Sequence, residues 1–286
     1  MTEAVHSIRA MLRLFEASSH AKLYAEFRPN PPASLINAVV QAVKEKLPLD
    51  RALDVGCGNG QNTRCLAPHF RSMLATDVSP EQIKEATANN TITNIEYRVY
   101  PAEEIPAPAE SVQLVTACQC CHFFELPRFF AEADRVLVPG GVLALYGYGF
   151  PEPYRDGALW TELNDVIVQA QVALAGFWTH ILKDVEDRYS DPRFRLPFPG
   201  EVRDESHYQE RTLTLDGLLG GISTWSGFQT MVDRCGAERG EALLRQTRER
   251  LHAVLSNGDP EVDTSAIAIT VRYFYFLLMA RKPVPP

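Results

Sequence analysis

The stretch from Arg51 to Gly60 reads Arg-Ala-Leu-Asp-Val-Gly-Cys-Gly-Asn-Gly. Leu53 and Val55 are the apolar residues of a predicted strand end, and glycine then takes every second position from 56 to 60. Glycine lets bare backbone approach a ligand and lets the chain adopt positive φ. In open α/β sheets, ligands bind at the carboxyl ends of strands, most often near the first strand-to-helix turn. The stretch therefore predicts a strand, a ligand-binding glycine loop and a helix.

The spacing of these glycines separates two kinds of nucleotide-binding loop. A dinucleotide site has the pattern G-x-G-x-x-G, whereas this loop has G-x-G-x-G, with Asp54 two positions before the first glycine. The departure argues against NAD or FAD. The loop resembles motif I of the class I methyltransferases, D-x-G-x-G-x-G, which binds S-adenosylmethionine. A tight turn without a ligand is the alternative interpretation, because short motifs carry false positives.

Predicted helices and strands alternate around the loop. Residues 1–20 and 33–47 repeat apolar side chains at helical spacing. Further helices are predicted at 61–70, 81–90 and 127–137, and strands at 53–55, 72–76, 95–99, 112–117 and 142–148, the last after a turn at Pro139-Gly140-Gly141. This alternation predicts a parallel sheet with right-handed crossovers.

A second acidic residue, Asp77, follows the predicted strand at 72–76. An acid at this position is placed to accept hydrogen bonds from ribose hydroxyls. Its alternative role would be to cap the next helix. Ser79 is the better cap, with Pro80 at the first helical position. We therefore expect Asp77 to be available for the ligand.

After Phe150 the alternation stops. A helix is predicted over 157–180, strands at 193–198 and 209–215, helices within 216–256 and a last strand over 266–279. A long segment before the last strand would cover the carboxyl edge of the sheet, where a lid over the acceptor belongs. We expect one domain over 1–286 in four parts: N-terminal helices and cofactor lid (1–50), cofactor-binding core (51–150), acceptor-binding insertion (151–265) and final strand (266–286).

The composition is that of a globular protein, with 286 residues, 45% hydrophobic and 22% charged. The net charge of -8 disfavours a nucleic-acid partner, and we expect no membrane span and a cytoplasmic location. The six cysteines, at 57, 65, 118, 120, 121 and 235, offer no second pair with finger-like spacing after the cluster at 118–121, so we expect no metal site. The composition leaves the oligomeric state open.

Several short motifs resemble one branch of the class I methyltransferases, the trans-aconitate methyltransferase-like proteins. They are Phe27-Arg-Pro after Tyr24, the glycine loop, Asp77-Val-Ser, Cys121-His-Phe-Phe-Glu125, Leu145-Tyr-Gly-Tyr148 and Thr224-Trp-Ser. The resemblance implies an α/β Rossmann-like methyltransferase fold. Its sheet would be mostly parallel and seven-stranded, with helices on both faces and a lid insertion before the last strand.

The resemblance also implies roles for individual residues. Those expected to bind S-adenosylmethionine are Tyr24, Arg28, Asp54, Gly56, Cys57, Gly58, Asp77, Val78, Ala102, Glu103 and Cys118. Many relatives carry Gly-Asp-Ala in the third loop, whose Asp reaches the adenine amine. This chain has Tyr100-Pro101-Ala102 instead, so adenine needs another acceptor, for which Glu103 is the candidate.

The residues expected at the acceptor side are His122, Phe123, Tyr148 and Trp225. His122 is the candidate catalytic residue, with a structural hydrogen bond as its alternative role. Tyr148 and Trp225 could instead pack the core. A carboxylate acceptor is ionised at neutral pH and needs no base, and arginines between 193 and 211 could pair with it. We therefore expect methyl transfer to a carboxylate oxygen of an anionic metabolite. A methyltransferase of a neutral small molecule, or an inactive cofactor-binding protein, are the alternatives.

Overall fold

The structure is a computed structural model, and it describes residues 27–178 and 181–285. A single mixed sheet of ten strands organises it, with the order β3-β2-β1-β4-β5-β10-β6-β7 and with β8 and β9 also paired to β10. The strands are β1 (Arg51–Val55), β2 (Ser72–Asp77), β3 (Ile95–Val99), β4 (Val112–Cys118), β5 (Leu137–Tyr148), β6 (Glu152–Arg155), β7 (Ala158–Leu159), β8 (Val202–Asp204), β9 (Tyr208–Leu213) and β10 (Ile269–Arg281).

The first five strands are parallel, and the long strand β10 runs antiparallel to β5. Strands β3, β2, β1, β4, β5, β10 and β8 form the seven-stranded sheet that the family resemblance implies, although β8 lies outside every strand predicted from the sequence. The first half of β10 extends beyond β5, where it pairs with β6 on one side and β9 on the other. The sheet is therefore larger than predicted, because β10 is long enough to pair with β5 and β8 in its second half and with β6 and β9 in its first half.

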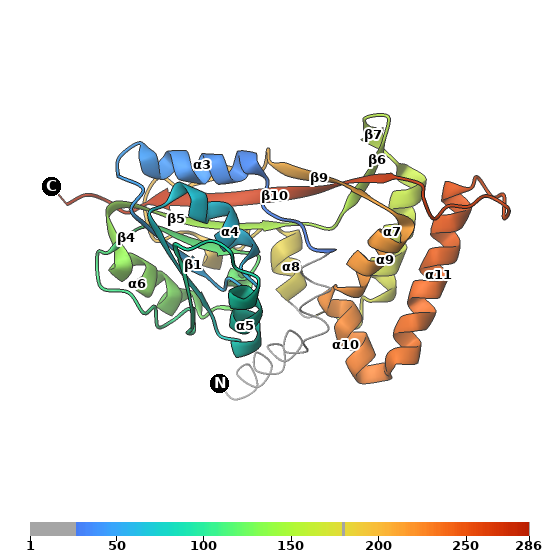
Figure 1. The fold of residues 1–286 in the computed structure, drawn as a ribbon, viewed down its shortest axis with the longest axis horizontal. Coiled ribbons are helices and arrows are strands. Elements are labelled where there is room, and N and C mark those ends of the chain that lie inside the picture. The colour runs from blue at the N-terminus through green and yellow to red at the C-terminus, as the bar shows by residue number, and fades with distance from the viewer. Residues whose placement is uncertain (1–26, 179–180, 286) are drawn as a thin grey trace.

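Helices cover both faces of the parallel part (Figure 1). The helices α3 (Ala33–Lys44) and α4 (Gln61–Leu66) bury their apolar side chains against one face, together with residues such as Met73, Leu114 and Ala144. Helix α5 (Pro80–Ala88) packs beside them on β2 and β3. The opposite face packs against α6 (Leu126–Val136) and the segment 185–198, which begins in the last turn of α8 (Ile181–Glu186). The fold is thus the predicted Rossmann-like arrangement.

Four helices of the insertion gather at the far end of β10, whereas α8 and the chain that follows it lie under the parallel sheet (Figure 1). The four are α7 (Thr161–Ala173), α9 (Leu215–Ser223), α10 (Ser226–Cys235) and α11 (Ala237–Leu255). These helices pack on one another, and their buried side chains continue the core of the α3 face through Tyr148, Tyr273 and Tyr275. Among the described helices, none is long and apolar enough to cross a membrane.

Most of the predicted elements are confirmed within a few residues of their predicted ends, but some predictions were wrong. The segment 193–198 is not a strand: Pro192–Phe194 forms a 3-10 turn, and Pro192 and Pro197 cannot donate to a ladder. Its alternating burial, with Phe194, Leu196 and Phe198 inside, is that of a loop lying on the sheet.

Three boundaries also differ from the prediction. The predicted helix over 61–70 ends at Leu66 and continues as a 3-10 turn. The helix predicted over 157–180 is shorter, Thr161–Ala173. Strand β5 begins at Leu137 and runs through the predicted turn, where its register against β4 shifts. The helix predicted over 1–20 lies outside the described residues.

Candidate functional site

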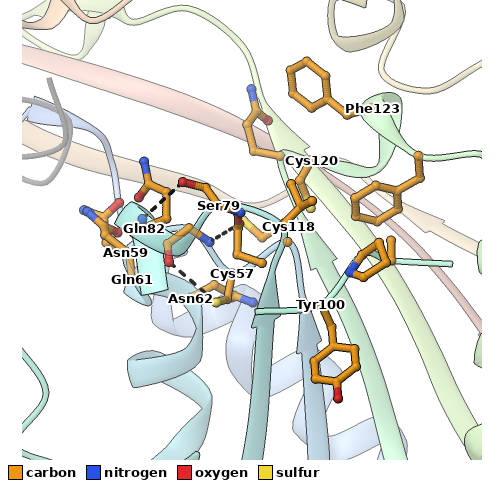
Figure 2. A pocket seen from close by; sticks show the side chains of 18 of the residues that line it. Cys57, Asn59, Gln61, Asn62, Ser79, Gln82, Tyr100, Cys118, Cys120 and Phe123 are labelled. Carbon is orange, nitrogen blue, oxygen red and sulfur yellow. Dashed lines mark hydrogen bonds between the residues drawn. The ribbon is translucent and has the colours of Figure 1, made fainter. Parts of the chain in front are cut away.

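A cavity of about 400 Å³ lies at the carboxyl ends of the parallel strands. Figure 2 shows it with Ser79 and Gln82 on one side, Phe123 on the other, and Cys118 and Cys120 between them. The described residues that line it are Pro29, Pro31, 56–59, Gln61, Asn62, 77–79, Gln82, 100–103, 118–120, 123–125, Arg128 and Tyr148. The strand order places the loops after β3, β2 and β1 in one half of this cavity and the ends of β4 and β5 in the other.

The glycine loop closes the floor of the cavity because two of its positions exclude a side chain. Gly56 has φ of 67°, and a Cβ there would lie 2.7 Å from the sulfur of Cys120. Gly60 has φ of 82°, and a Cβ there would lie 2.4 Å from the hydroxyl of Tyr97. The bare backbone of the loop thus forms a cradle of the kind that approaches a ligand closely.

Asp77 fixes this loop and also lines the cavity. One carboxylate oxygen accepts the main-chain N–H of Gly58 at 2.9 Å, and the other accepts that of Ser79 at 2.9 Å. Ser79 caps α5 as predicted, its hydroxyl accepting the N–H of Gln82. Asp77 does not cap α5, but its carboxylate also serves the main chain of the glycine loop and of its own turn. Each oxygen nevertheless keeps a second lone pair for a ligand. Burial raises the pKa of Asp77, although these N–H donors oppose the shift.

Asp54 lies beneath the loop, fully buried and away from the cavity wall. Its carboxylate accepts hydrogen bonds from Asn62 at 2.8 Å, Thr63 at 2.5 Å and Thr116 at 2.9 Å. The hydroxyl of Tyr146 donates to the amide oxygen of Asn62 at 2.7 Å. Burial raises the pKa of Asp54 to about 6. The side chain expected to contact the methionine moiety instead ties β1 to α4 and β4.

Most of the other residues expected to bind the cofactor lie on the cavity wall. These are Cys57, Val78, Ala102, Glu103 and Cys118. Burial raises the pKa of the Cys57 and Cys118 thiols well above the usual range, so both are protonated at neutral pH.

The expected adenine acceptor is already engaged. One carboxylate oxygen of Glu103 accepts the main-chain N–H of Glu125 at 2.8 Å, at the start of α6. Pro101 lines the same part of the wall and offers no side-chain acceptor. A ligand at this end would therefore meet main-chain groups and the second oxygen of Glu103.

Of the four residues expected at the acceptor side, two line the cavity and two do not. Phe123 and Tyr148 line the cavity, at the ends of β4 and β5. Trp225 does not, and packs with Phe150 and Trp178 at centroid distances of 4.8 and 6.2 Å in the core of the insertion.

His122 lies beside the cavity rather than on its wall. Its Nδ1 shares a hydrogen bond of 2.7 Å with the hydroxyl of Tyr189, which belongs to the loop after α8. Burial, with the Arg193 guanidinium adding to it, lowers the pKa of His122 to about 3. The imidazole is therefore neutral, and its position is that of a structural hydrogen-bonding group.

The N-terminal segment reaches the cavity through Pro29 and Pro31. Arg28 donates to the carbonyl oxygen of Thr224 at 2.9 Å, and Arg211 donates to that of Phe27 at 2.9 Å. The guanidinium of Arg28 thus points to the insertion, not to the described wall. Tyr24 lies outside the described residues.

The arginines expected to attract an anion lie elsewhere. Arg193 pairs with Asp184, and Arg203 pairs with Glu205 at 2.7 Å. Arg195 is exposed, and Arg211 holds the main chain of the N-terminal segment. None of the four is on the described wall.

Sequence reasoning missed several polar residues that line the cavity, among them Asn59, Gln61, Gln82, Tyr100 and Gln119. Gln119 could have been found from its place directly after a predicted strand, where a parallel sheet presents side chains to ligands. The others follow from the same rule only once the loop and helix boundaries are known.

Comparison with known proteins gives a consistent picture. A family model described as a methyltransferase domain matches residues 53–145. A Dictyostelium discoideum protein named as a methyltransferase is 30% identical over 269 residues, covering 92% of this chain and 94% of that protein. A Saccharomyces cerevisiae protein named as an S-adenosylmethionine-dependent methyltransferase is 28% identical over 134 residues, 45% of each chain. A solved structure of an Anaeromyxobacter dehalogenans protein, described as a type II methyltransferase, has a TM-score of 0.74 at 28% identity, and the match covers 91% of this chain and 100% of that one.

The similarity spans the core and the insertion alike, so it concerns the whole architecture and not the glycine loop alone. The cradle at Gly56 and the carboxylate of Asp77 fit a nucleoside-bearing cofactor, with bare backbone for its charged end and paired acceptors for its ribose. The chain belongs to the methyltransferase family, as an enzyme that uses S-adenosylmethionine.

Proposed function

We propose that the chain transfers the methyl group to a carboxylate oxygen of a small anionic molecule. One observation carries this proposal: the half of the cavity at the ends of β4 and β5 holds no described side chain that accepts a proton at neutral pH. Its described side chains are an amide, two thiols and two aromatic rings, from Gln119, Cys118, Cys120, Phe123 and Tyr148. Phe124 and Glu125 also line the cavity, but on the cofactor side: the Phe124 ring lies beside Gly56, and the Glu125 carboxylate pairs with Arg128 at 3.3 Å. Burial raises the pKa of both thiols well above the usual range.

The other half of the cavity would hold the cofactor. The glycine loop, Asp77 and Val78 come from the ends of β1 and β2, and Ala102 with Glu103 follows β3. When bound, S-adenosylmethionine supplies a methyl group that is attached to a sulfonium sulfur. That sulfur is intrinsically a good leaving group. The protein's contribution is to hold the acceptor in line with that methyl group, which can be worth roughly 7–11 kcal/mol.

A carboxylate acceptor is compatible with the half of the cavity that holds no base, because a carboxylate is already nucleophilic at neutral pH. Its reference pKa is about 4, so it needs no proton acceptor. An amine or phenol would need a positioned base. His122 does not supply one, since it lies off the described wall and burial lowers its pKa to about 3. The resemblance of several motifs to those of trans-aconitate methyltransferase-like proteins favours the same acceptor class.

A second candidate is a methyltransferase of a neutral small molecule. The observation that favours it is the charge of the wall: its described basic side chain is Arg128, which lies on the cofactor side and pairs with Glu125 at 3.3 Å. A neutral acceptor would need no cation at the β4 and β5 ends. Within this proposal, residues 51–150 form the cofactor-binding core and residues 151–265 the insertion that covers the acceptor.

The experiment is transfer of a labelled methyl group from S-adenosylmethionine to a deproteinised metabolite extract. We expect a labelled product that loses its label in mild alkali, as a methyl ester does, and a rate that barely changes between about pH 6 and 9. An alkali-stable product, with a rate that rises about tenfold per pH unit, would instead establish N-methylation or phenol methylation.

A further inference from the structure

The cavity wall at the end of β4 holds one amide side chain, Gln119, in an unusually constrained position. Its backbone has φ of 56°, a left-handed conformation that is uncommon for a residue with a long side chain. Its main-chain N–H donates to the carbonyl oxygen of Tyr146 at 2.8 Å, which joins this residue to the end of β5. Backbone outliers of this kind concentrate at functional sites, where the surroundings hold them in place.

The amide of Gln119 is fixed by the main chain of Tyr148. Its Oε1 accepts the N–H of Tyr148 at 2.8 Å, and its Nε2 donates to the carbonyl oxygen of the same residue at 3.2 Å. The two bonds determine which end of the amide is nitrogen, because the main-chain N–H can only donate and the C=O can only accept. Gly147 leaves room for this arrangement, since a Cβ there would lie 2.6 Å from Oε1.

One donor of this amide remains unused. A primary amide has two N–H donors, and in the part of the chain that the structure describes only one of them has a partner, the carbonyl oxygen of Tyr148. The residue stands at the junction of β4 and β5, in the half of the cavity away from Asp77 and the loop after β3. Because Gln119 lines this half of the wall, its second N–H can serve as a donor to an acceptor bound there.

We propose that Gln119 is a positioning residue, whose remaining N–H donates to an oxygen of the methyl acceptor and so presents a second oxygen to the methyl group. A carboxylate has the two oxygens that this requires. The inference rests on the proposed function and deepens it, because it names the group that selects and orients the acceptor. An amide can do this without taking part in proton transfer, which suits a wall without a base.

The test compares Gln119→Met with Gln113→Met in the full chain. Gln113 lies at the opposite end of β4, off the cavity, and its Oε1 accepts the main-chain N–H of Arg51 at 2.7 Å. Both variants lose a side-chain amide that braces a neighbouring strand, but only one loses a donor to the acceptor. Affinity for S-adenosylhomocysteine is measured by calorimetry. Methyl transfer is measured with a dilution series of the deproteinised extract, which gives an apparent KM and kcat.

For Gln119→Met we expect methyl transfer in dilute extract to fall about tenfold to a hundredfold, the effect of losing a hydrogen bond to a charged group. The affinity for S-adenosylhomocysteine should stay within about twofold, and Gln113→Met should keep both properties. Gln119→Glu keeps the bond from the Tyr148 N–H but adds a negative charge, so it should be worse than Gln119→Met for a carboxylate acceptor.

Three results would overturn the inference. If Gln119→Met and Gln119→Glu keep the wild-type kinetics, the amide does not contact the acceptor. If the affinity for S-adenosylhomocysteine falls as much as turnover, or Gln113→Met has the same kinetic defect, the role of Gln119 is only structural. If the wild-type protein binds S-adenosylhomocysteine but methylates no component of the extract, the proposed function itself fails, and this inference with it.

Discussion

The carboxylate of Asp77 accepts the main-chain N–H of Gly58 at 2.9 Å, so the end of β2 holds the glycine loop that follows β1. Two features found separately in the sequence, an acid after the second strand and a run of glycines after the first, are thus parts of one unit. One oxygen of the carboxylate holds the glycine loop, the other holds the turn before α5 through Ser79, and each keeps a second lone pair for the cofactor.

Replacing Asp77 should therefore weaken cofactor binding in two ways. Asp77→Ala removes both the ribose acceptor and the bond to the loop. Asp77→Asn also disrupts the loop, because its NH₂ group would face one of two N–H donors. We expect the affinity for S-adenosylhomocysteine, measured by calorimetry, to fall about tenfold to a hundredfold in each variant.

The matched control for this prediction is Asp204→Ala. Asp204 also accepts the N–H two residues further on, that of Ser206 at 2.8 Å, but it lies on β8 away from the cavity. Its variant should bind S-adenosylhomocysteine like the wild type. An unchanged affinity in Asp77→Ala would show that the ribose lies elsewhere.

The buried carboxyl of Asp54 should make stability fall as pH rises. Burial raises its pKa from 3.8 to about 6, so the folded protein keeps a proton that the unfolded chain releases at lower pH. Its contribution to stability is therefore largest below about pH 4, declines up to about pH 6 and is constant above. A shift of two units corresponds to about 3 kcal/mol.

Asp54→Asn should remove this slope. The measurement is the free energy of unfolding in urea for both proteins between about pH 4 and 7.5, and the quantity of interest is the difference between them. Asp50→Asn, which changes an exposed carboxylate, serves as the control and should keep the wild-type slope. A difference between wild type and Asp54→Asn that does not vary with pH would contradict the prediction.

The core of the fold could be predicted from the sequence because its signals are local. Most strands of the parallel sheet contain a short apolar run, as in β1 and β4, and the start of α5 is marked by Ser79 before Pro80. The insertion lacks such signals. Its alternation at Phe194, Leu196 and Phe198 suggested a strand, but a loop lying on a sheet buries alternate side chains as well.

The site was predicted less completely, since a side chain's direction depends on partners far away in the sequence. Asp54 is the last but one residue of β1 and Asp77 the last of β2, yet the first is directed under the loop to Asn62 and Thr116 and the second lines the cavity. His122 was expected at the acceptor, but its partner, Tyr189, is 67 residues further along the chain. No local pattern predicts that pairing.

The two glycines at 56 and 58 should differ in their tolerance of alanine. Both have positive φ, of 67° and 53°, but a Cβ at Gly56 would lie 2.7 Å from the Cys120 sulfur, whereas at Gly58 the nearest atom is 3.8 Å away. A left-handed alanine costs roughly 1–2 kcal/mol, and overpacking adds about 1–3 kcal/mol. Gly56→Ala should thus be destabilised more, as thermal and urea unfolding would show.

Cys120 offers a direct check of this interpretation. Cys120→Ala removes the sulfur that the new Cβ would meet, so it should restore part of the stability of Gly56→Ala and none of that of Gly58→Ala. The interpretation fails if the double-mutant cycle shows no coupling between positions 56 and 120.

His122→Asn should change the pH dependence of stability more than turnover. Burial lowers the pKa of His122 from 6.5 to about 3, so the unfolded chain takes up a proton that the folded protein excludes. This contribution to stability is present above about pH 6.5 and is lost as pH falls towards 3, the opposite slope to that of Asp54. Urea unfolding of the variant should show a weaker loss of stability in acid.

Turnover of His122→Asn should fall by less than about tenfold, with the shape of the pH-rate profile unchanged, because the imidazole is neutral and off the described wall. A variant in which one limb of the pH-rate profile disappears would show that His122 does act as a base.

The segment 27–32 should close the cavity more firmly when cofactor is bound. Pro29 and Pro31 line the cavity, while Arg211 holds the carbonyl oxygen of Phe27 at 2.9 Å. The ring of Phe27 packs on Gly220, where a Cβ would lie 2.5 Å away. The segment is therefore anchored to the insertion. Arg211→Ala should increase chymotryptic cleavage after Phe27 about fivefold, the effect of roughly 1 kcal/mol, and S-adenosylhomocysteine should slow cleavage of the wild type.

The control is Arg203→Ala, which removes an arginine of β8 that pairs with Glu205. This variant should leave the cleavage rate unchanged. Equal rates with and without S-adenosylhomocysteine would exclude closure over the cofactor, and equal rates in wild type and Arg211→Ala would exclude the anchor.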